Sequence, residues 1–229
     1  MKYSAVIFDL FGTLVDFGPP GEYERSITAM ANVLSVAKED FQRLWTDTYR
    51  FRFTGEHPDA EYNIKYICSE LGLKVTDDQI QRAAQVRLNF SSRSLIPRDD
   101  VPETINELKT RGYKIGLISD CSTDVPALWN DTPLCSLIDE PVFSCSVGLT
   151  KPDPQIFYLA CERLGVKPAE CLYVGDGGSS ELTGASQVGM SPVLIRAPYD
   201  QTGDRFRMSP SEWDGSKISS IREILTLVD

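Results

Sequence analysis

The sequence predicts an α/β protein in which a parallel β-sheet with flanking helices is joined to a second unit made of helices alone. Two observations predict this. Five short apolar runs alternate with segments of helical periodicity along most of the chain. Residues 17–97, in contrast, show helical periodicity without strand-like β-branched runs. Strands and helices that alternate along a chain form parallel sheets with right-handed connections.

The five apolar runs are the expected strands. They are apolar at successive positions, which is typical of strands covered by helices on both faces. Helices are expected at residues 104–111, 155–164 and 181–188, and a glycine, a common stop signal, follows each of them. The expected strands are Ala5–Phe8, Lys114–Ile118, Pro141–Phe143, Cys171–Val174 and Pro192–Ile195. Because such sheets bind ligands beyond the carboxyl ends of their strands, we expect the functional site at that edge.

Four amphipathic helices are expected between the first two strands. Residues 22–34, 41–48, 62–71 and 78–90 each carry apolar side chains at helical spacing. Helices of this kind bury their apolar stripes against one another, as in a four-helix bundle. We therefore expect two domains, with residues 1–16 and 98–229 forming the sheet domain and residues 17–97 the inserted helical domain.

Composition excludes several classes of function. The formal net charge is −10, and an acidic chain repels phosphate backbones, so no nucleic-acid partner is expected. A small anionic substrate is compatible with this charge, because the charge of a pocket matters more than the total. No run approaches the roughly 20 apolar residues that span a bilayer, and the N-terminal run is too short for a signal peptide. We expect no membrane partner and a cytoplasmic location; the oligomeric state is left open.

Cysteine and histidine usage argues against two common kinds of site. No two of the six cysteines are separated by only two residues, and the single histidine, His57, lies near none of them, so a zinc site is not expected. A Ser-His-Asp triad would depend entirely on His57, which lies in a loop-like segment. Catalytic groups are therefore sought among carboxylates, lysine, serine and threonine.

Polar clusters follow four of the five expected strands. Asp9 ends the first strand, and Ser119-Asp120 end the second. Thr150-Lys151 come shortly after the third, and Asp176 lies within a glycine-rich turn after the fourth. A doubly wound sheet brings the carboxyl ends of its strands to one edge, so we expect these clusters to meet there.

In this order and placement the clusters resemble the motifs of the haloacid dehalogenase superfamily of hydrolases. Asp9 with Gly12-Thr13 resembles the first motif, Ser119 the second, Lys151 the third, and Asp176 with Glu181 the fourth. The resemblance extends over the whole chain. It implies a Rossmann-like core, and it implies that residues 17–97 are a helical cap that closes over the active site.

Each of these residue types suits one chemical role. The Asp9 carboxylate can attack an electrophile such as phosphorus and form an acyl-phosphate that water hydrolyses. The hydroxyls of Thr13 and Ser119, together with backbone amides of the turn at Gly12 and of Asp120, can hold substrate oxygens as charge develops. Lys151 supplies a positive charge that offsets the nucleophile and the transferring group.

A magnesium site is expected beside the nucleophile. Mg²⁺ prefers hard oxygen ligands, usually one or two carboxylates, and Asp9 and Asp176 form the natural pair. The resemblance implies that the backbone carbonyl of Phe11 is a third ligand. Glu181 is expected either to hold a metal-bound water or to orient Lys151. These assignments favour a magnesium-dependent phosphatase that acts on a small phosphorylated metabolite through an aspartyl-phosphate on Asp9.

One position departs from the family pattern. Phosphatases of the family have a second aspartate two residues after the nucleophile, which protonates the leaving group, and here that residue is Phe11. A positioned acid or base contributes roughly 10²–10⁴ in rate. A phosphatase would then need a substrate with a good leaving group, or another acid, for which Asp16 and the acids of the helical cap are candidates.

Three other interpretations stay open. The family's 2-haloacid dehalogenases also lack the second aspartate, and they need no metal. They use a cap arginine to receive the halide, and the candidates for it here are Arg25, Arg50 and Arg52. The family's carbon–phosphorus hydrolases need a cap lysine, and the lysines of the helical insertion are Lys38, Lys65 and Lys74. The third alternative is a binding protein without catalytic activity.

Overall fold

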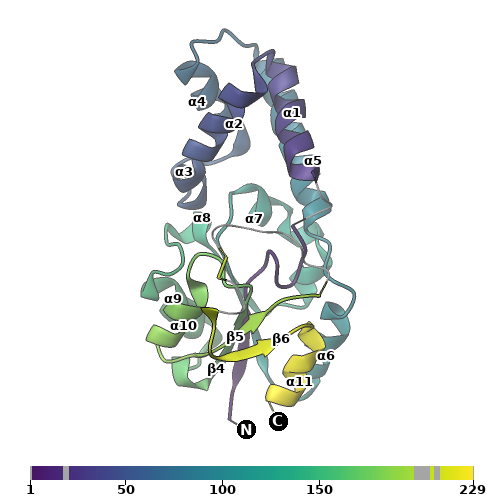
Figure 1. The fold of residues 1–229 in the computed structure, drawn as a ribbon, viewed down its shortest axis with the longest axis vertical. Coiled ribbons are helices and arrows are strands. Elements are labelled where there is room, and N and C mark those ends of the chain that lie inside the picture. Colours follow the sequence, from purple (N-terminus) through teal and green to yellow (C-terminus); the bar gives the residue numbers. More distant parts are fainter. Residues whose placement is uncertain (1, 18–20, 199–206, 209–211, 229) are drawn as a thin grey trace.

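A six-stranded parallel sheet with helices on both faces forms the larger part of the molecule (Figure 1). The computed structural model describes residues 2–17, 21–198, 207–208 and 212–228. The strands lie in the order β3-β2-β1-β4-β5-β6, and every neighbouring pair is parallel. Their bounds are β1 Ala5–Phe8, β2 Lys114–Ser119, β3 Glu140–Phe143, β4 Cys171–Gly175, β5 Ser191–Ile195 and β6 Ser216–Ile218. This confirms the predicted α/β, Rossmann-like class.

Strand β1 lies at the centre and divides its side chains between two apolar layers. Val6 and Phe8 belong to the core on one face, whereas Ala5 and Ile7 belong to the core on the other. Alternation of this kind follows from the two-residue period of a strand. Because both faces are buried, all four residues are apolar.

Helices cover both layers. On the face of Val6 and Phe8, α6 (Val101–Thr110) buries its apolar side, and on the opposite face α9 (Pro154–Leu164) and α10 (Glu181–Gln187) do the same. The remaining helices of this part are short: α7 (Asp124–Leu128), α8 (Ser144–Val147), α11 (Ile224–Leu227), and the 3₁₀ turns Trp129–Asp131, Pro133–Ser136, Pro168–Glu170 and Ile221–Glu223.

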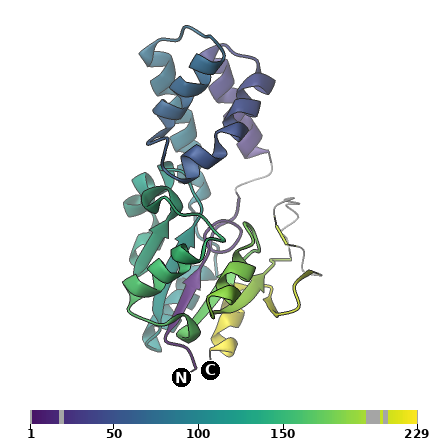
Figure 2. The same cartoon turned by 90° about the vertical axis from the view of Figure 1, so that its left-hand side faces the viewer.

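The segment between β1 and β2 folds into a helical group that stands beyond the carboxyl edge of the sheet (Figures 1 and 2). It has its own apolar core, in which Met30, Phe41, Trp45, Ile64 and Ile80 are buried. Its helices are α1 (Glu22–Leu34), α2 (Lys38–Asp47), α3 (Tyr49–Phe53), α4 (Ala60–Glu70) and α5 (Asp77–Ser94). The group touches the sheet part where α3 meets α8 and where α5 meets α7.

The described part of this group therefore has five helices where the sequence predicted four. The additional helix, α3, follows α2 after a break at Thr48. The Thr48 hydroxyl donates to the carbonyls of Leu44 and Trp45, and such bonds from a threonine back to the preceding turn bend helices. None of the helices among the described residues combines the length and apolarity needed to cross a bilayer.

The central strand should control stability. Ile7 is fully buried and Ile96 is 67% exposed, so the same Ile→Ala change can be made at both positions. Ile7→Ala should lower the free energy of unfolding by roughly 2–5 kcal/mol through lost burial and a residual cavity. Ile96→Ala should change it by less than about 0.5 kcal/mol. Urea denaturation of both variants measures the difference, and equal midpoints would contradict the placement of β1 in the core.

Candidate active site

The nucleophile candidate Asp9 directly follows β1 and starts a tight turn. Its backbone N–H donates to the carbonyl of Val174 on β4, 2.9 Å away. The chain then turns through Gly12, whose φ is +78°, and this returns Thr13 so that its hydroxyl donates to Asp9 Oδ2 at 3.1 Å. A Cβ at Gly12 would collide with the Asp176 carboxylate. Gly12 is thus required both for the turn and for the close approach of the two motifs.

Lys151 connects two of the acidic residues. Its Nζ lies 2.6 Å from Asp9 Oδ1 and 2.5 Å from Glu181 Oε2, and its side chain is buried. Burial lowers the pKa of Lys151, but the charges of Asp9 and Glu181 outweigh burial and hold that pKa well above its ordinary value. The Asp120 carboxylate accepts a hydrogen bond from the backbone N–H of Lys151 at 3.0 Å. Asp120 therefore fixes the loop that presents the lysine.

Glu181, in the first turn of α10, is fully buried and fully bonded. Its Oε1 accepts from the Gly177 backbone N–H at 2.9 Å, and its Oε2 accepts from the Tyr173 hydroxyl at 2.8 Å as well as from Lys151. Burial, followed by the charge of Asp9, raises the pKa of Glu181 to about 8. Of the two roles expected for Glu181, these contacts match the orientation of Lys151.

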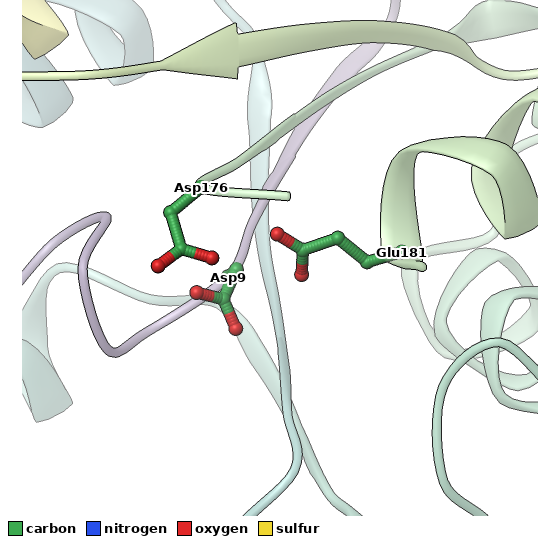
Figure 3. Close-up of side chains that lie close together, drawn as sticks. All are labelled: Asp9, Asp176 and Glu181. Atoms are coloured by element: carbon green, nitrogen blue, oxygen red, sulfur yellow. The ribbon is translucent and has the colours of Figure 1, made fainter. Parts of the chain in front are cut away.

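Asp176 follows β4, next to β1, and completes a cluster of carboxylates (Figure 3). Oxygens of Asp9, Asp176 and Glu181 all lie within 4.8 Å of one another, and all three residues are buried. Asp176 Oδ1 accepts from the Gly178 backbone N–H at 2.8 Å, and its Oδ2 forms an ion pair with Arg207. Two segments distant in sequence, the turn after β1 and the connection from β4 to α10, thus bring their acids to one point, as expected from the sheet topology.

The cluster fits a divalent cation. Burial raises the pKa of Asp9, the charge of Lys151 lowers it, and the charge of Asp176 raises it further. Like charges crowded in a buried site repel one another unless a cation compensates them. Of the described residues, Lys151 and Arg207 form ion pairs with these three acids, which leaves one negative charge in excess when all are ionised. Carboxylate oxygens are also the ligands that Mg²⁺ prefers.

The remaining predicted site residues lie around this cluster. Ser119 ends β2 and is buried, and among the described residues its hydroxyl has no hydrogen-bond partner. Contact of that hydroxyl with a substrate oxygen stays a prediction. Phe11 lies in the same turn as Gly12, and its ring stacks on Phe17 with 6.2 Å between centroids. Ligation of a metal by the Phe11 carbonyl stays a prediction.

Several other candidates are engaged elsewhere. His57 is buried, with its ring 2.6 Å from the Asn63 side chain and stacked on Phe51. Asp16 forms an ion pair with Arg98 at 2.7 Å, which opposes a role as proton donor. In the helical group, Lys65 pairs with Asp77 at the surface. Also exposed are Lys74, Arg25 and Arg50, whereas Lys38 is half-buried.

Sequence reasoning missed two residues of the site. Tyr173 lies inside β4, and the hydroxyl of a tyrosine in a buried strand needs a hydrogen-bond partner. This requirement could have marked Tyr173 in the sequence as a residue that contacts a polar group. Arg207 pairs with Asp176 and lies over the Phe17 ring at 4.7 Å. No spacing or motif marks Arg207, because it reaches the site from a segment remote from the four motifs.

Comparisons with known proteins point to one family of hydrolases. The sequence model of the haloacid dehalogenase-like hydrolase family matches residues 3–189. The glyceraldehyde 3-phosphate phosphatase of Methanopyrus kandleri is 37% identical over 232 residues, which cover 98% of this chain and 96% of that protein. The (S)-2-haloacid dehalogenase 4A of Burkholderia cepacia is 26% identical over 196 residues, covering 83% of this chain and 82% of that protein.

The fold is shared with solved structures of the same kind. The crystal structure of a 2-haloacid dehalogenase from Pseudomonas syringae pv. Tomato superposes with a TM-score of 0.68 at 22% identity, covering 99% of this chain and 98% of that one. Phosphatases and dehalogenases thus both occur among the similar proteins. On the extent of the family match and the identity to a full-length relative, the chain belongs to the haloacid dehalogenase-like hydrolase family.

Proposed function

We propose that this hydrolase is a magnesium-dependent phosphatase that acts on a small phosphorylated metabolite through an aspartyl-phosphate on Asp9. The observation that carries the proposal is the buried carboxylate cluster of Asp9, Asp176 and Glu181 around Lys151. A metal-free displacement of halide has no need for Asp176 beside the nucleophile. The 37% identity to a phosphatase along nearly the whole chain supports the same choice.

The residues of the site divide the reaction between them. An Asp9 oxygen attacks phosphorus, and the bond from phosphorus to the leaving oxygen breaks; water then hydrolyses the acyl-phosphate and restores the carboxylate. Lys151, the hydroxyls of Thr13 and Ser119, and the backbone amide of Asp120 meet the charge that develops on the phosphoryl oxygens. These donors are fixed before the reaction by the sheet edge, so they need little reorganisation. The Gly12 N–H, which was also expected to contribute, donates to the Val15 carbonyl at 2.7 Å.

The metal completes this charge balance. Asp9 and Asp176 would hold Mg²⁺, with the Phe11 carbonyl as a third ligand and Glu181 acting through a water or through Lys151. Bound there, the ion would neutralise phosphoryl oxygens and the cluster's excess negative charge. Residues 17–97 would serve as the cap domain over residues 1–16 and 98–229, excluding bulk water when closed.

Phe11 sets the requirement on the leaving group. Its ring stacks on Phe17 and cannot transfer a proton, and Asp16 is held by Arg98. The turn after β1 therefore presents no positioned acid to the leaving oxygen. The proposed enzyme favours substrates whose leaving oxygen needs little protonation, and the same feature keeps dehalogenation as the second candidate function.

The nucleophile is tested by Asp9→Asn. Loss of the attacking carboxylate should lower kcat by at least about 10⁴-fold, the order seen when a catalytic nucleophile is removed. Lys151 keeps Glu181 as a partner, so the variant should stay folded, as circular dichroism can verify. Asp131→Asn, a change at an exposed position, is the matched control. Normal turnover by Asp9→Asn would refute the assignment of the nucleophile.

The reaction class is tested with two substrates under two conditions. p-Nitrophenyl phosphate and 2-chloropropionate are each assayed with magnesium and with a chelator, by release of nitrophenol and of chloride. We expect phosphatase activity that the chelator removes and added magnesium restores, because the carboxylate cluster needs a cation. Chloride release that resists the chelator, without phosphatase activity, would establish dehalogenation instead.

The missing acid is tested by Phe11→Asp. A carboxyl group placed there should raise kcat for glycerol 3-phosphate by about 10²-fold, since general acids contribute roughly 10²–10⁴ in rate. The alkoxide of this substrate is a poor leaving group and needs a proton. The gain for p-nitrophenyl phosphate should be much smaller, because nitrophenolate leaves without a proton. Phe11→Asn is the control, because asparagine has the shape of aspartate but no ionisable group. An equal gain from both variants would show that ring removal, and not proton transfer, is responsible.

A further inference from the structure

A second cluster of buried charge lies between the helical group and the loop that follows β2. A narrow pocket there is lined by Trp45, Arg52, Asp59, Ala60 and Arg87 from the helical group and by residues Ser122–Asp124 from the sheet part. The two arginines stand beside one indole ring: the guanidinium carbons of Arg52 and Arg87 lie 4.4 and 5.7 Å from the Trp45 ring centre. The catalytic steps described above use none of these side chains.

Only one of the two arginines has a carboxylate partner among the described residues. Arg87 pairs with Asp124 at 2.9 Å, and Asp124 also accepts from the hydroxyls of Ser91 and Ser122. Burial raises the pKa of Asp124, but the charge of Arg87 and these hydroxyls outweigh it and hold the pKa below its ordinary value. Asp124 thus remains ionised and its charge is compensated by Arg87.

Arg52 is left with an unbalanced charge. It is 7% exposed, its terminal nitrogen donates to the Trp45 carbonyl at 2.7 Å, and it forms no ion pair with any residue that the structure describes. Burial and the neighbouring Arg87 lower its pKa to about 10, so it is protonated at neutral pH. A buried charge without a counterion is costly. Asp59, the second carboxylate of the lining, is exposed and accepts a hydrogen bond from the Tyr62 backbone N–H at the start of α4. The buried side chains of the pocket, taken alone, therefore have an excess positive charge.

Hydrogen-bond donors of the pocket are also unmet. Within the described part of the chain, three buried N–H groups of the lining residues have no acceptor: Trp45 Nε1, Arg52 Nε and Arg87 Nε. Buried donors normally find a partner, and a group of unmet ones calls for an explanation. Three unmet donors, together with one excess positive charge among the buried side chains, match an anionic acceptor.

The pocket lies within reach of the candidate active site. Its wall at Ser122 is three residues from Ser119, and three extended residues span at most about 11 Å. Both the helical group and the sheet part contribute to it. A ligand that fills it therefore contacts both sides of the boundary across which the helical group would close.

We propose that this pocket binds a carboxylate carried by the substrate, with Arg52 and Arg87 as specificity-determining residues. The inference rests on the proposed function, since it assigns the pocket to the substrate of that reaction. A carboxylate is favoured over a second phosphate because it is planar, needs less room, and matches the donor geometry of a guanidinium group. The substrate class is then a phosphorylated small carboxylic acid whose leaving oxygen needs little protonation.

The test compares two compounds that differ at one carbon. In 3-phosphoglycerate a carboxylate stands where glycerol 3-phosphate has a hydroxymethyl group. Each is titrated into the protein with a chelator present, and binding is followed by tryptophan fluorescence, for which Trp45 is a local reporter. Wild type should bind 3-phosphoglycerate roughly tenfold to a hundredfold more tightly, the range expected for hydrogen bonds to a charged group. Equal affinity for the two compounds would overturn the proposal.

Variants of Arg52 test whether the preference for 3-phosphoglycerate arises in the pocket. Arg52→Gln should bring the ratio of the two affinities close to one, and so should Arg52→Met, which removes all donors but keeps the apolar stem. Both should fold, because Thr48 still donates to the Trp45 carbonyl. Arg50→Gln, at an exposed position of the same helix, should keep the wild-type ratio. A preference that survives in both Arg52 variants would overturn the proposal.

A parallel assay with magnesium separates this inference from the proposed function. If p-nitrophenyl phosphate, which needs no proton donor, is not hydrolysed while the binding preference is intact and depends on Arg52, the phosphatase proposal fails and the carboxylate pocket stands. If p-nitrophenyl phosphate is hydrolysed and binding shows no preference, the pocket assignment fails and the phosphatase proposal stands.

Discussion

The site depends on one constraint: three carboxylates are buried close together at the edge of a sheet, and they can stay there only because cations compensate them. Lys151 carries most of this task, since its ammonium group contacts Asp9 and Glu181 at once. Removing one partner of a buried ion pair leaves an uncompensated charge and costs several kcal/mol, on the order of 3–5. Three local features keep these groups in place: the turn after β1, the hydrogen bond between Asp120 and the Lys151 backbone, and the first turn of α10.

The sheet order explains how such a cluster forms from distant segments. Because β1 lies between β2 and β4, the residues that follow these strands share one edge. The register places Phe8 beside both Leu117 and Val174, so Asp9 is nearly level with Ser119 and Asp176. Strand β1 is paired on both sides, with β2 and with β4, and this pairing holds the alignment. Catalytic groups that are fixed by strand ends need little reorganisation during the reaction.

Much of this arrangement could be predicted from the sequence, because it depends on local patterns. Apolar runs gave the five longer strands, and the polar residues just after them gave Asp9, Lys151 and Asp176. What could not be predicted depends on contacts between remote segments. Arg207 reaches Asp176 across the fold, and β6 is three residues long with only Ile218 buried. No periodicity can mark a strand so short, and no motif can mark a partner that is set by tertiary packing.

The two buried clusters differ in the sign of their excess charge, and this difference bears on specificity. The chain as a whole carries −10, so its long-range field repels anionic metabolites, and attraction has to arise locally. At the sheet edge the described residues leave a negative excess once all three acids are ionised, and a divalent cation can compensate it. At the boundary with the helical group, Arg52 leaves a positive excess among the buried side chains that a carboxylate can balance. A compound with anionic groups at both ends fits this division, because one end binds through a metal and the other through arginine. Since each cluster is incomplete without its ligand, substrate binding would stabilise the sheet part and its boundary with the helical group together.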